Sequence, residues 1–205
     1  MSYIFDGPES SPLTIALAHG AGAPMDSPFM ADLAAGLGAR GWRVARFEFP
    51  YMARRRADGK KRPPDKQEAL LTTWREVIGE LGPERLVIGG KSMGGRMASL
   101  VADGSGVAGL LCFGYPFHPP GKPDKTRIDH LRRLATPALI AQGTRDPLGN
   151  SDEIAAYPLD PAIAFHWAPD GNHDLAPRKR SGYTAEGNLT EALAAADRFL
   201  RGIVG

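Results

Sequence analysis

Residues 86–94, Leu-Val-Ile-Gly-Gly-Lys-Ser-Met-Gly, join a short apolar run to a glycine-rich turn. This stretch indicates the fold more clearly than any other part of the chain. Residues 86–89 are typical of a buried strand, and the residues from Ser92 onward have a helical pattern. Gly90, Ser92 and Gly94 fit the spacing G-x-S-x-G. On a sharp strand-to-helix turn this spacing exposes the serine hydroxyl, because the glycines carry no Cβ atoms that would clash. The stretch therefore predicts a nucleophilic Ser92 at a helix N-terminus, where free N–H groups favour developing negative charge.

Short apolar runs and helical segments alternate along the whole chain. This order favours a mainly parallel sheet covered by helices on both faces, so we expect a doubly wound α/β fold of about six to seven strands. The expected strands cover residues 13–18, 44–49, 86–89, 109–113, 138–143 and 163–167. The expected helices cover residues 27–39, 65–81, 92–102, 127–134, 151–157 and 190–201.

The helix expected at residues 65–81 has the clearest boundaries. Asp65 and Glu68 are spaced as a capping box, and Gly82 followed by Pro83 stops the helix. Apolar residues recur at helical spacing and predict a stripe that faces the sheet. This stripe comprises Leu70, Leu71, Trp74, Val77, Ile78 and Leu81.

Length and composition indicate one folded domain, residues 1–205, because about 150 residues per domain is typical. Apolar residues make up 42% and charged residues 23%, and the formal charge of +2 gives no argument for a nucleic-acid or membrane partner. The single cysteine, Cys112, allows neither an internal disulfide nor a cysteine-based metal site. Residues 1–12 lack a basic region followed by an apolar stretch, so a cytoplasmic protein is expected.

Two further polar residues follow predicted strands and extend the hypothesis of a nucleophilic serine. Asp146 comes just after the strand at 138–143, and His173 follows the strand at 163–167. The chain order Ser, Asp, His, each on a loop after a strand, is that of a hydrolase triad on a doubly wound sheet. We assign Ser92 as nucleophile, His173 as general base and Asp146 as its orienting acid. The alternative acids are Asp152, Asp170 and Asp174.

Residues 19–22, His-Gly-Ala-Gly, follow the first apolar strand. Small residues there let the backbone approach a substrate, and the N–H groups of Ala21 and Met93 are the predicted oxyanion-hole donors. We expect His19 to hold this loop by hydrogen bonds, and we include His19 and Gly22 among the pocket residues. Lys91 is expected to point to solvent or to a nearby acid.

Two competing motifs are excluded by their positions. Gly90-Lys91-Ser92 resembles the end of the phosphate-binding P-loop, G-x-x-x-x-G-K-[ST]. That motif requires a glycine at position 85, where this chain has Arg85. Residues 104–109 match the dinucleotide fingerprint G-x-G-x-x-G, yet they precede a strand and open no helix. We therefore expect neither nucleotide nor dinucleotide binding, and no cofactor or metal.

A set of five motifs carries a family resemblance. The set comprises residues 17–22 (LAHGAG), 89–96 (GGKSMGGR), 114–120 (GYPFHPP), 143–146 (GTRD) and 171–173 (GNH). With it the chain resembles the α/β-hydrolases over nearly its whole length. More narrowly, it resembles a small family that includes a vertebrate testis-expressed protein and, as one domain, a subunit of the NSL histone-acetylation complex.

The resemblance implies a triad of Ser92, Asp146 and His173, with oxyanion donors at Ala21 and Met93, and it implies no substrate. Dienelactone-hydrolase-like enzymes form a neighbouring group, but their nucleophile is a cysteine where this chain has Ser92. The leading hypothesis is a serine hydrolase that cleaves carboxylic esters or thioesters of small acyl groups through an acyl-enzyme. The alternative is a non-catalytic binding or scaffold module on the same fold.

The connection after the strand at 109–113 bears on access to the pocket. Residues 114–126 are too few for a helical lid, so an open cleft suited to small acyl substrates is expected. Tyr115, Phe117 and His118 are candidate pocket residues; the other interpretation is a proline-stiffened connection.

Basic residues cluster at 54–62 and at 178–180. Both clusters follow predicted strands, and three interpretations are open. They are solvated loops, they form a positive rim that attracts an anionic ester, or they bind nucleic acid. The expected partner is a small ester or thioester, anionic in the second case, while the oligomeric state is not encoded in these patterns.

Overall fold

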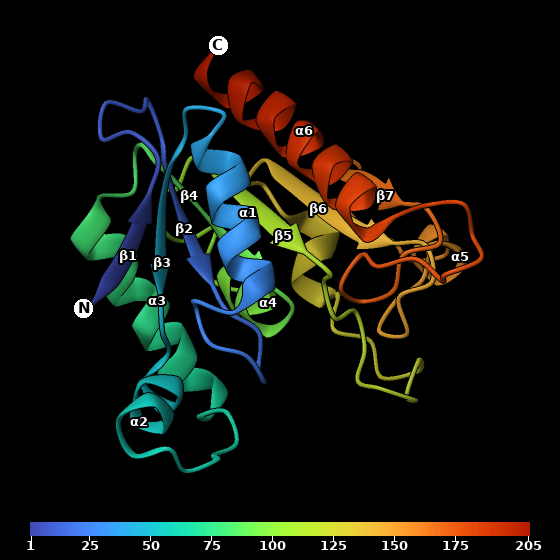
Figure 1. Ribbon diagram of the computed structural model, residues 1–205, viewed down its shortest axis with the longest axis horizontal. Helices are drawn as coiled ribbons and strands as arrows, with labels where there is room; N and C mark the ends of the chain where they lie inside the picture. Colours follow the sequence, from blue (N-terminus) through green and yellow to red (C-terminus); the bar gives the residue numbers. More distant parts are fainter.

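The computed structural model describes residues 1–205 and contains one seven-stranded sheet in the order β1-β3-β2-β4-β5-β6-β7 (Figure 1). Strands β2 to β7 are parallel, and β1 pairs antiparallel with β3 at one edge. The strands are β1 (Tyr3–Asp6), β2 (Thr14–Ala18), β3 (Arg43–Phe47), β4 (Leu86–Lys91), β5 (Gly109–Phe113), β6 (Ala138–Gly143) and β7 (Ile163–Ala168). The predicted mainly parallel sheet is confirmed.

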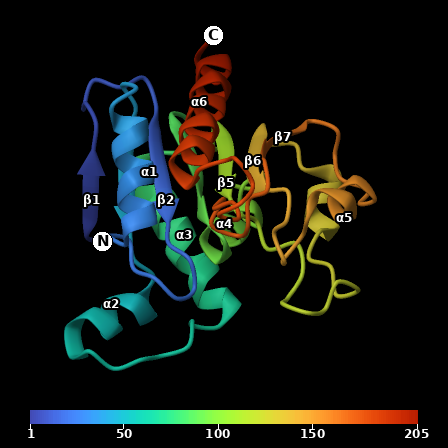
Figure 2. The same ribbon diagram turned by 45° about the vertical axis from the view of Figure 1, so that its right-hand side comes forward.

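Helices cover both faces of the sheet. Figure 1 and Figure 2 show α1 and α6 on one face and α3 and α4 on the other. Smaller helical segments lie beyond the carboxyl end of β3 and near β7. The helices are α1 (Pro28–Gly38), α2 (Pro50–Asp58), α3 (Gln67–Leu81), α4 (Met93–Ser99), α5 (Ser151–Ala155) and α6 (Ala185–Val204), with a 3₁₀ helix at Asp129–Arg133. None of them combines the length and the apolar composition that a bilayer crossing requires.

The strand side chains alternate between two apolar cores. In β2, Ile15 and Leu17 pack in the core under α1 and α6, whereas Ala16 and Ala18 face the core under α3 and α4. All four are fully buried. Strands buried on both faces are apolar at every position, which is why the central strands appear in the sequence as short continuous apolar runs. Burying a side chain as large as leucine contributes about 1.5–3 kcal/mol to the free energy of folding, so both cores stabilise the sheet.

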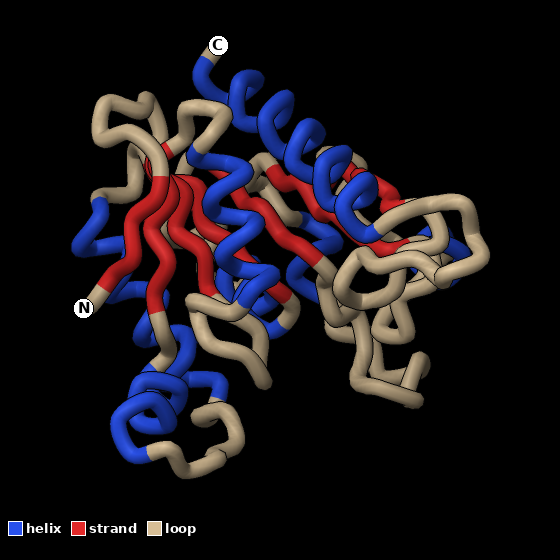
Figure 3. Tube along the Cα trace, in the orientation of Figure 1, coloured by secondary structure: helices blue, strands red, loops and turns tan.

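The parallel strands bring their carboxyl ends to the same edge of the sheet. Long loops gather at that edge (Figure 3), including those that follow β2, β5, β6 and β7. Ligands bind at this edge in open parallel sheets. The fold therefore places the loops that carry the candidate residues next to one another.

Two elements were not expected from the sequence. The edge strand β1 occupies Tyr3–Asp6, and α2 occupies Pro50–Asp58, where an irregular connection was expected. In α2 only Tyr51 and Met52 are buried, so no apolar stripe marks the helix. Pro50 at its first turn is the one local signal for its start.

The predicted cap of the helix at 65–81 is wrong. Helix α3 begins at Gln67 after Lys66, without a side-chain cap. The Asp65 carboxylate instead accepts hydrogen bonds from the Tyr51 N–H at 2.9 Å and from Arg54 at 2.5 Å. Asp65 therefore satisfies a free N–H group of α2, which a sequence pattern confined to one helix does not reveal. The apolar stripe of α3 is buried as predicted, apart from the partly exposed Leu81.

The connection after β5 contains no α-helix, as expected, but its aromatic side chains point inward. Tyr115 and Phe117 are fully buried, and His118 is only 3% exposed. The Tyr115 hydroxyl contacts Ser99 Oγ at 3.1 Å and His130 Nε2 at 3.3 Å. The prediction that Tyr115, Phe117 and His118 line the pocket is wrong. Tyr115 and Phe117 pack into the core beneath the loop, and the buried His118 contacts the Pro119 carbonyl and Glu153.

The partly buried His130 gives the fold a pH-dependent stability. Burial, together with the positive charge of Arg96, lowers the pKa of His130 from 6.5 to about 4. As the pH falls below 6.5 the unfolded chain binds a proton that the folded chain does not, so stability decreases until the pH reaches about 4. His130→Gln should show a weaker decrease in the free energy of unfolding, measured by urea denaturation on either side of this interval. The same pH dependence in both proteins would contradict the assignment.

Candidate active site

Ser92 lies between β4 and α4 with a left-handed backbone, φ 52° and ψ −118°. Such a conformation costs about 1–3 kcal/mol in a residue with a Cβ, and it lifts the side chain off the sheet. Gly90 and Gly94, on either side of the serine, pack so closely against β2 that neither position has room for a Cβ atom. A Cβ atom at Gly90 would lie 2.0 Å from the Ala18 carbonyl oxygen, and one at Gly94 would lie 2.5 Å from the same atom. The turn can therefore form only with glycine at both positions.

A continuous chain of hydrogen bonds joins Ser92, His173 and Asp146. Ser92 Oγ lies 2.8 Å from His173 Nε2, and His173 Nδ1 lies 2.8 Å from Asp146 Oδ2. These contacts fit an imidazole whose Nδ1–H donates to the carboxylate and whose Nε2 accepts from the serine hydroxyl. The structure thus brings together three residues from the loops after β4, β6 and β7.

The other candidate acids are engaged elsewhere. Asp170 binds Arg178 at 2.5 Å, Asp174 pairs with Lys91 at 3.1 Å, and Asp152 is exposed in the first turn of α5. Of the four carboxylates considered, Asp146 is the one that reaches His173 Nδ1.

Gln142 supports this carboxylate and was not recognised in the sequence. Its Nε2 donates to Asp146 Oδ2 at 2.9 Å, and the Leu148 N–H donates to Oδ1 at 2.8 Å. The Gln142 Oε1 also accepts a hydrogen bond from the Tyr115 N–H, and its Nε2 donates to the carbonyl oxygens of Tyr115 and Gly149. Gln142 and Asp146 are fully buried. The signal available in the sequence was a polar amide at the end of an apolar strand, where a buried group needs partners.

Lys91 adopts the second of its two expected orientations, toward an acid. Its Nζ donates to the His173 carbonyl at 2.5 Å, pairs with Asp174 and lies 5.3 Å from the centre of the Phe29 ring. Burial lowers the pKa of the Lys91 ammonium group. Lys91 therefore ties the loop that carries His173 to the end of β4.

The expected oxyanion donors lie beside the serine. Met93 is the first residue of α4, so its N–H is one of the free groups at the helix N-terminus. The Ala21 N–H has no acceptor within the chain, while its carbonyl accepts from the Tyr51 hydroxyl at 2.9 Å. Ala21, Ser92 and Met93 line one cavity.

His19 is fully buried and fixes the loop that contains Ala21. Its Nε2 accepts from the Phe49 N–H at 3.1 Å, and its Nδ1 donates to the Gly20 carbonyl at 2.7 Å. Burial lowers the pKa of His19, so the ring stays neutral. Since both ring nitrogens are used, His19 has the structural role expected of it and lines neither cavity at the serine.

Two cavities meet at Ser92. The smaller, of about 280 Å³, is lined by His173, Lys91, Phe29 and residues 20–23, and so includes Gly22 as expected. The larger, of about 340 Å³, is lined by Met93, Arg96, Arg127, Pro116 and Leu148, among others. Ala21 borders both. The serine hydroxyl is therefore accessible from two sides.

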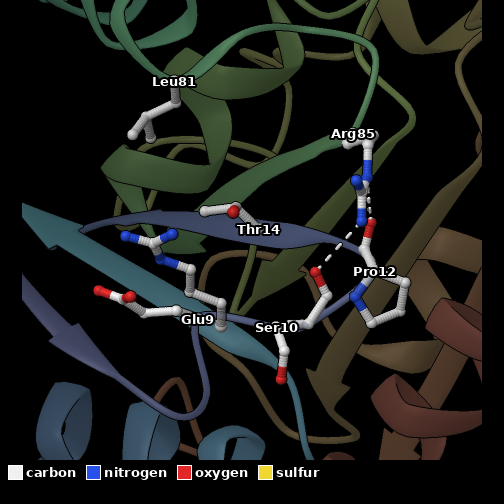
Figure 4. Close-up of a pocket in the computed structure, with 8 residues that line it drawn as sticks. Glu9, Ser10, Pro12, Thr14, Leu81 and Arg85 are labelled. Atoms are coloured by element: carbon white, nitrogen blue, oxygen red, sulfur yellow. Dashed lines mark hydrogen bonds between the residues drawn. The ribbon is translucent and has the colours of Figure 1, made fainter.

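A third hollow, of about 350 Å³, lies at the opposite edge of the sheet, beside Thr14 at the start of β2 (Figure 4). It contains no nucleophile paired with a base. Arg85, drawn in Figure 4, donates to the carbonyl oxygens of Ser11 and Pro12. This hollow is distant from the candidate residues.

The basic clusters do not line the cavities at Ser92. Several of their arginines are paired with carboxylates of the same surface: Arg54 with Asp65, Arg56 with Asp26 and Glu48, Arg62 with Asp58, and Arg178 with Asp170. In the first cluster Arg54, Arg55 and Arg56 lie on α2, and the other three basic residues follow its end, outside the cavity walls.

Comparison with known proteins is consistent with this architecture. The profile of the alpha/beta hydrolase domain matches residues 11–201. Among solved structures, the chain is similar to Est1E from Butyrivibrio proteoclasticus, with a TM-score of 0.71 at 13% identity over 98% of this chain and 93% of that one. A dienelactone hydrolase from Anabaena variabilis gives 0.68 at 19% identity, covering 97% and 89%. An alpha-beta serine hydrolase homologue from Coxiella burnetii gives 0.67 at 20% identity, covering 98% and 90%. At 13–20% sequence identity these structural matches show that the fold is shared, and nothing further.

Proposed function

The chain belongs to the alpha/beta hydrolase domain family, and on that basis we propose that it is a serine hydrolase for carboxylic esters or thioesters of small acyl groups. The observation that carries the proposal is the hydrogen-bond chain from Ser92 through His173 to Asp146. Two cavities open onto its reactive end. We also infer, from the five motifs, the narrower kinship with the testis-expressed and NSL-subunit family.

The first half of the reaction forms an acyl-enzyme. Ser92 Oγ attacks the carbonyl carbon of the substrate while His173 Nε2 takes the hydroxyl proton. The carbonyl oxygen becomes an oxyanion that accepts hydrogen bonds from the N–H groups of Ala21 and Met93. Asp146 fixes the imidazole tautomer and stabilises the imidazolium. The intermediate then collapses, and His173 gives its proton to the departing oxygen or sulfur.

The second half repeats these steps with water. His173 takes a proton from a water molecule that attacks the acyl carbon, and the new oxyanion occupies the same two N–H groups. Collapse breaks the bond to Ser92 Oγ, which regains its proton from His173. A carboxylic acid is released and the free hydroxyl is restored.

Labelling with a fluorophosphonate probe tests the proposal, because the probe reacts with activated serines irrespective of the natural acyl group. We expect one covalent adduct, located at Ser92 by peptide mass. A folded protein that takes up no label and hydrolyses no member of a broad ester and thioester panel would instead favour the non-catalytic module.

Lys91→Met should slow the reaction by disturbing the position of His173. The substitution keeps an unbranched side chain but removes the ammonium group, and with it the hydrogen bond to the His173 carbonyl and the pair with Asp174. A small displacement of a catalytic base lowers rates by about ten- to one-hundredfold. The rate constant of labelling at Ser92 measures the effect. The exposed Lys122→Met is the matched control and should label at the wild-type rate; an unchanged rate in Lys91→Met would contradict the positioning role.

A further inference from the structure

The larger cavity beside Ser92 contains two arginines without carboxylate partners. Arg96 and Arg127 both line it, and neither forms an ion pair. This distinguishes them from Arg54, Arg56 and Arg62 on the neighbouring surface, which are paired. Positive charge is therefore concentrated inside the cavity.

Arg96 lies one helical turn after the serine, and its backbone N–H donates to the Ser92 carbonyl at 3.0 Å. Its guanidinium makes one weak side-chain contact, to Gln67 Oε1 at 3.3 Å, and its Nε is shielded from solvent without any hydrogen-bond partner. Burial lowers the pKa of the Arg96 guanidinium, and the positive charge of Arg127 lowers it further. Both effects make an anion between the two groups favourable.

The cavity wall does not supply that anion. Asp65 is the one acidic residue that lines the cavity, and its two oxygens are bonded to the Tyr51 N–H and to Arg54. An anion held by Arg96 and Arg127 must therefore come from a ligand.

The position of His173 indicates which part of a substrate enters this cavity. His173 protonates the leaving group, so the leaving group lies on its side, and His173 lines the smaller cavity but not the larger. The acyl chain then extends into the larger cavity, past Met93 toward the two arginines.

We propose that Arg96 and Arg127 form a subsite for a carboxylate at the far end of the acyl group, so that the preferred substrates are monoesters or monothioesters of dicarboxylic acids. The planar guanidinium fork matches a carboxylate better than a lysine ammonium does. This inference rests on the proposed serine-hydrolase activity and adds its substrate class.

The test compares two series of 4-nitrophenyl esters with matched acyl chain lengths. One series ends in a carboxylate and the other in the isosteric, neutral carboxamide. At the best chain length, kcat/KM should favour the carboxylate by about ten- to one-hundredfold, the range expected for hydrogen bonds to a charged group. Arg96→Gln and Arg127→Gln should each reduce this preference, and Arg127→Lys should restore part of it relative to Arg127→Gln. In all three variants kcat/KM should fall more for the carboxylate series than for the carboxamide series.

Arg132→Gln, an exposed arginine outside the cavity, is the matched control and should leave the preference unchanged. Hydrolysis of both series at equal kcat/KM would overturn the carboxylate subsite while leaving the serine hydrolase intact. Arginine variants that affected both series alike would also overturn the subsite alone. Hydrolysis of neither series, together with absence of fluorophosphonate labelling, would overturn the proposed function and the subsite with it.

Discussion

Replacing Ser92 with alanine is expected to lower turnover of any ester substrate by a factor on the order of 10⁶, as for other triads whose members act as a unit. The substitution removes the oxygen that forms the acyl bond, and no neighbouring group replaces it. Apart from its contact with His173, the hydroxyl makes no side-chain hydrogen bond, so the surrounding structure does not depend on it. Fluorophosphonate labelling should disappear completely.

The fold should survive this change. Alanine carries the same Cβ as serine, so the left-handed backbone at position 92 is no more strained in the variant. We expect the melting temperature and the circular dichroism spectrum to stay close to those of the wild type. Ser181→Ala, on an exposed turn, should retain both activity and labelling. Residual labelling of the Ser92→Ala protein at another serine, with turnover preserved, would show that the nucleophile has been misassigned.

Asp146→Asn should lower turnover by about 10⁴, because it allows the wrong tautomer of His173. Three donors converge on the carboxylate: His173 Nδ1–H, Gln142 Nε2–H and the Leu148 N–H. An asparagine offers only one oxygen, so its amide group must face at least one donor. Imidazole can relieve that conflict by accepting from the amide at Nδ1, which places a proton on Nε2. It can then no longer take the proton of Ser92.

This variant should also be less stable. A buried donor without an acceptor costs about 1–3 kcal/mol, which thermal or urea unfolding detects. Asp152→Asn provides the control, since Asp152 is exposed in the first turn of α5 and should change neither turnover nor stability. Wild-type turnover in Asp146→Asn would contradict the role of this carboxylate.

The sequence predicted those parts of the fold that rest on repeating local patterns. The central strands and α3 are buried on faces that alternate regularly, so their apolar periodicity identifies them. The strand β1 at the sheet edge and the strongly basic α2 bury too little for such a pattern to appear. Asp65 shows a different limit: its partner Tyr51 belongs to another helix, and only the tertiary structure brings the two together.

In the candidate site, too, the residues marked by local sequence patterns were predicted, whereas those that depend on tertiary contacts were not. Ser92, Asp146 and His173 could be assigned because each follows a strand in a fixed order, and parallel strands end at one edge. Gln142 was missed because its partners Asp146, Tyr115 and Gly149 meet only where the loops after β5 and β6 pack together. For Lys91 the sequence indicated an acid as one possible partner, but not the His173 carbonyl. Tyr115 and Phe117 were misplaced because a proline-rich loop does not show in sequence which of its side chains turn inward.

The connection after β5 has a chemical consequence of its own. An enzyme that passes an acyl group to an acceptor other than water must keep bulk solvent away, usually with a segment that closes over the intermediate. No helical segment stands between β5 and the 3₁₀ helix to do this. If the proposed acyl-enzyme forms at Ser92, this connection supplies no helix to shield it, and we expect water rather than a second alcohol or thiol to take up the acyl group.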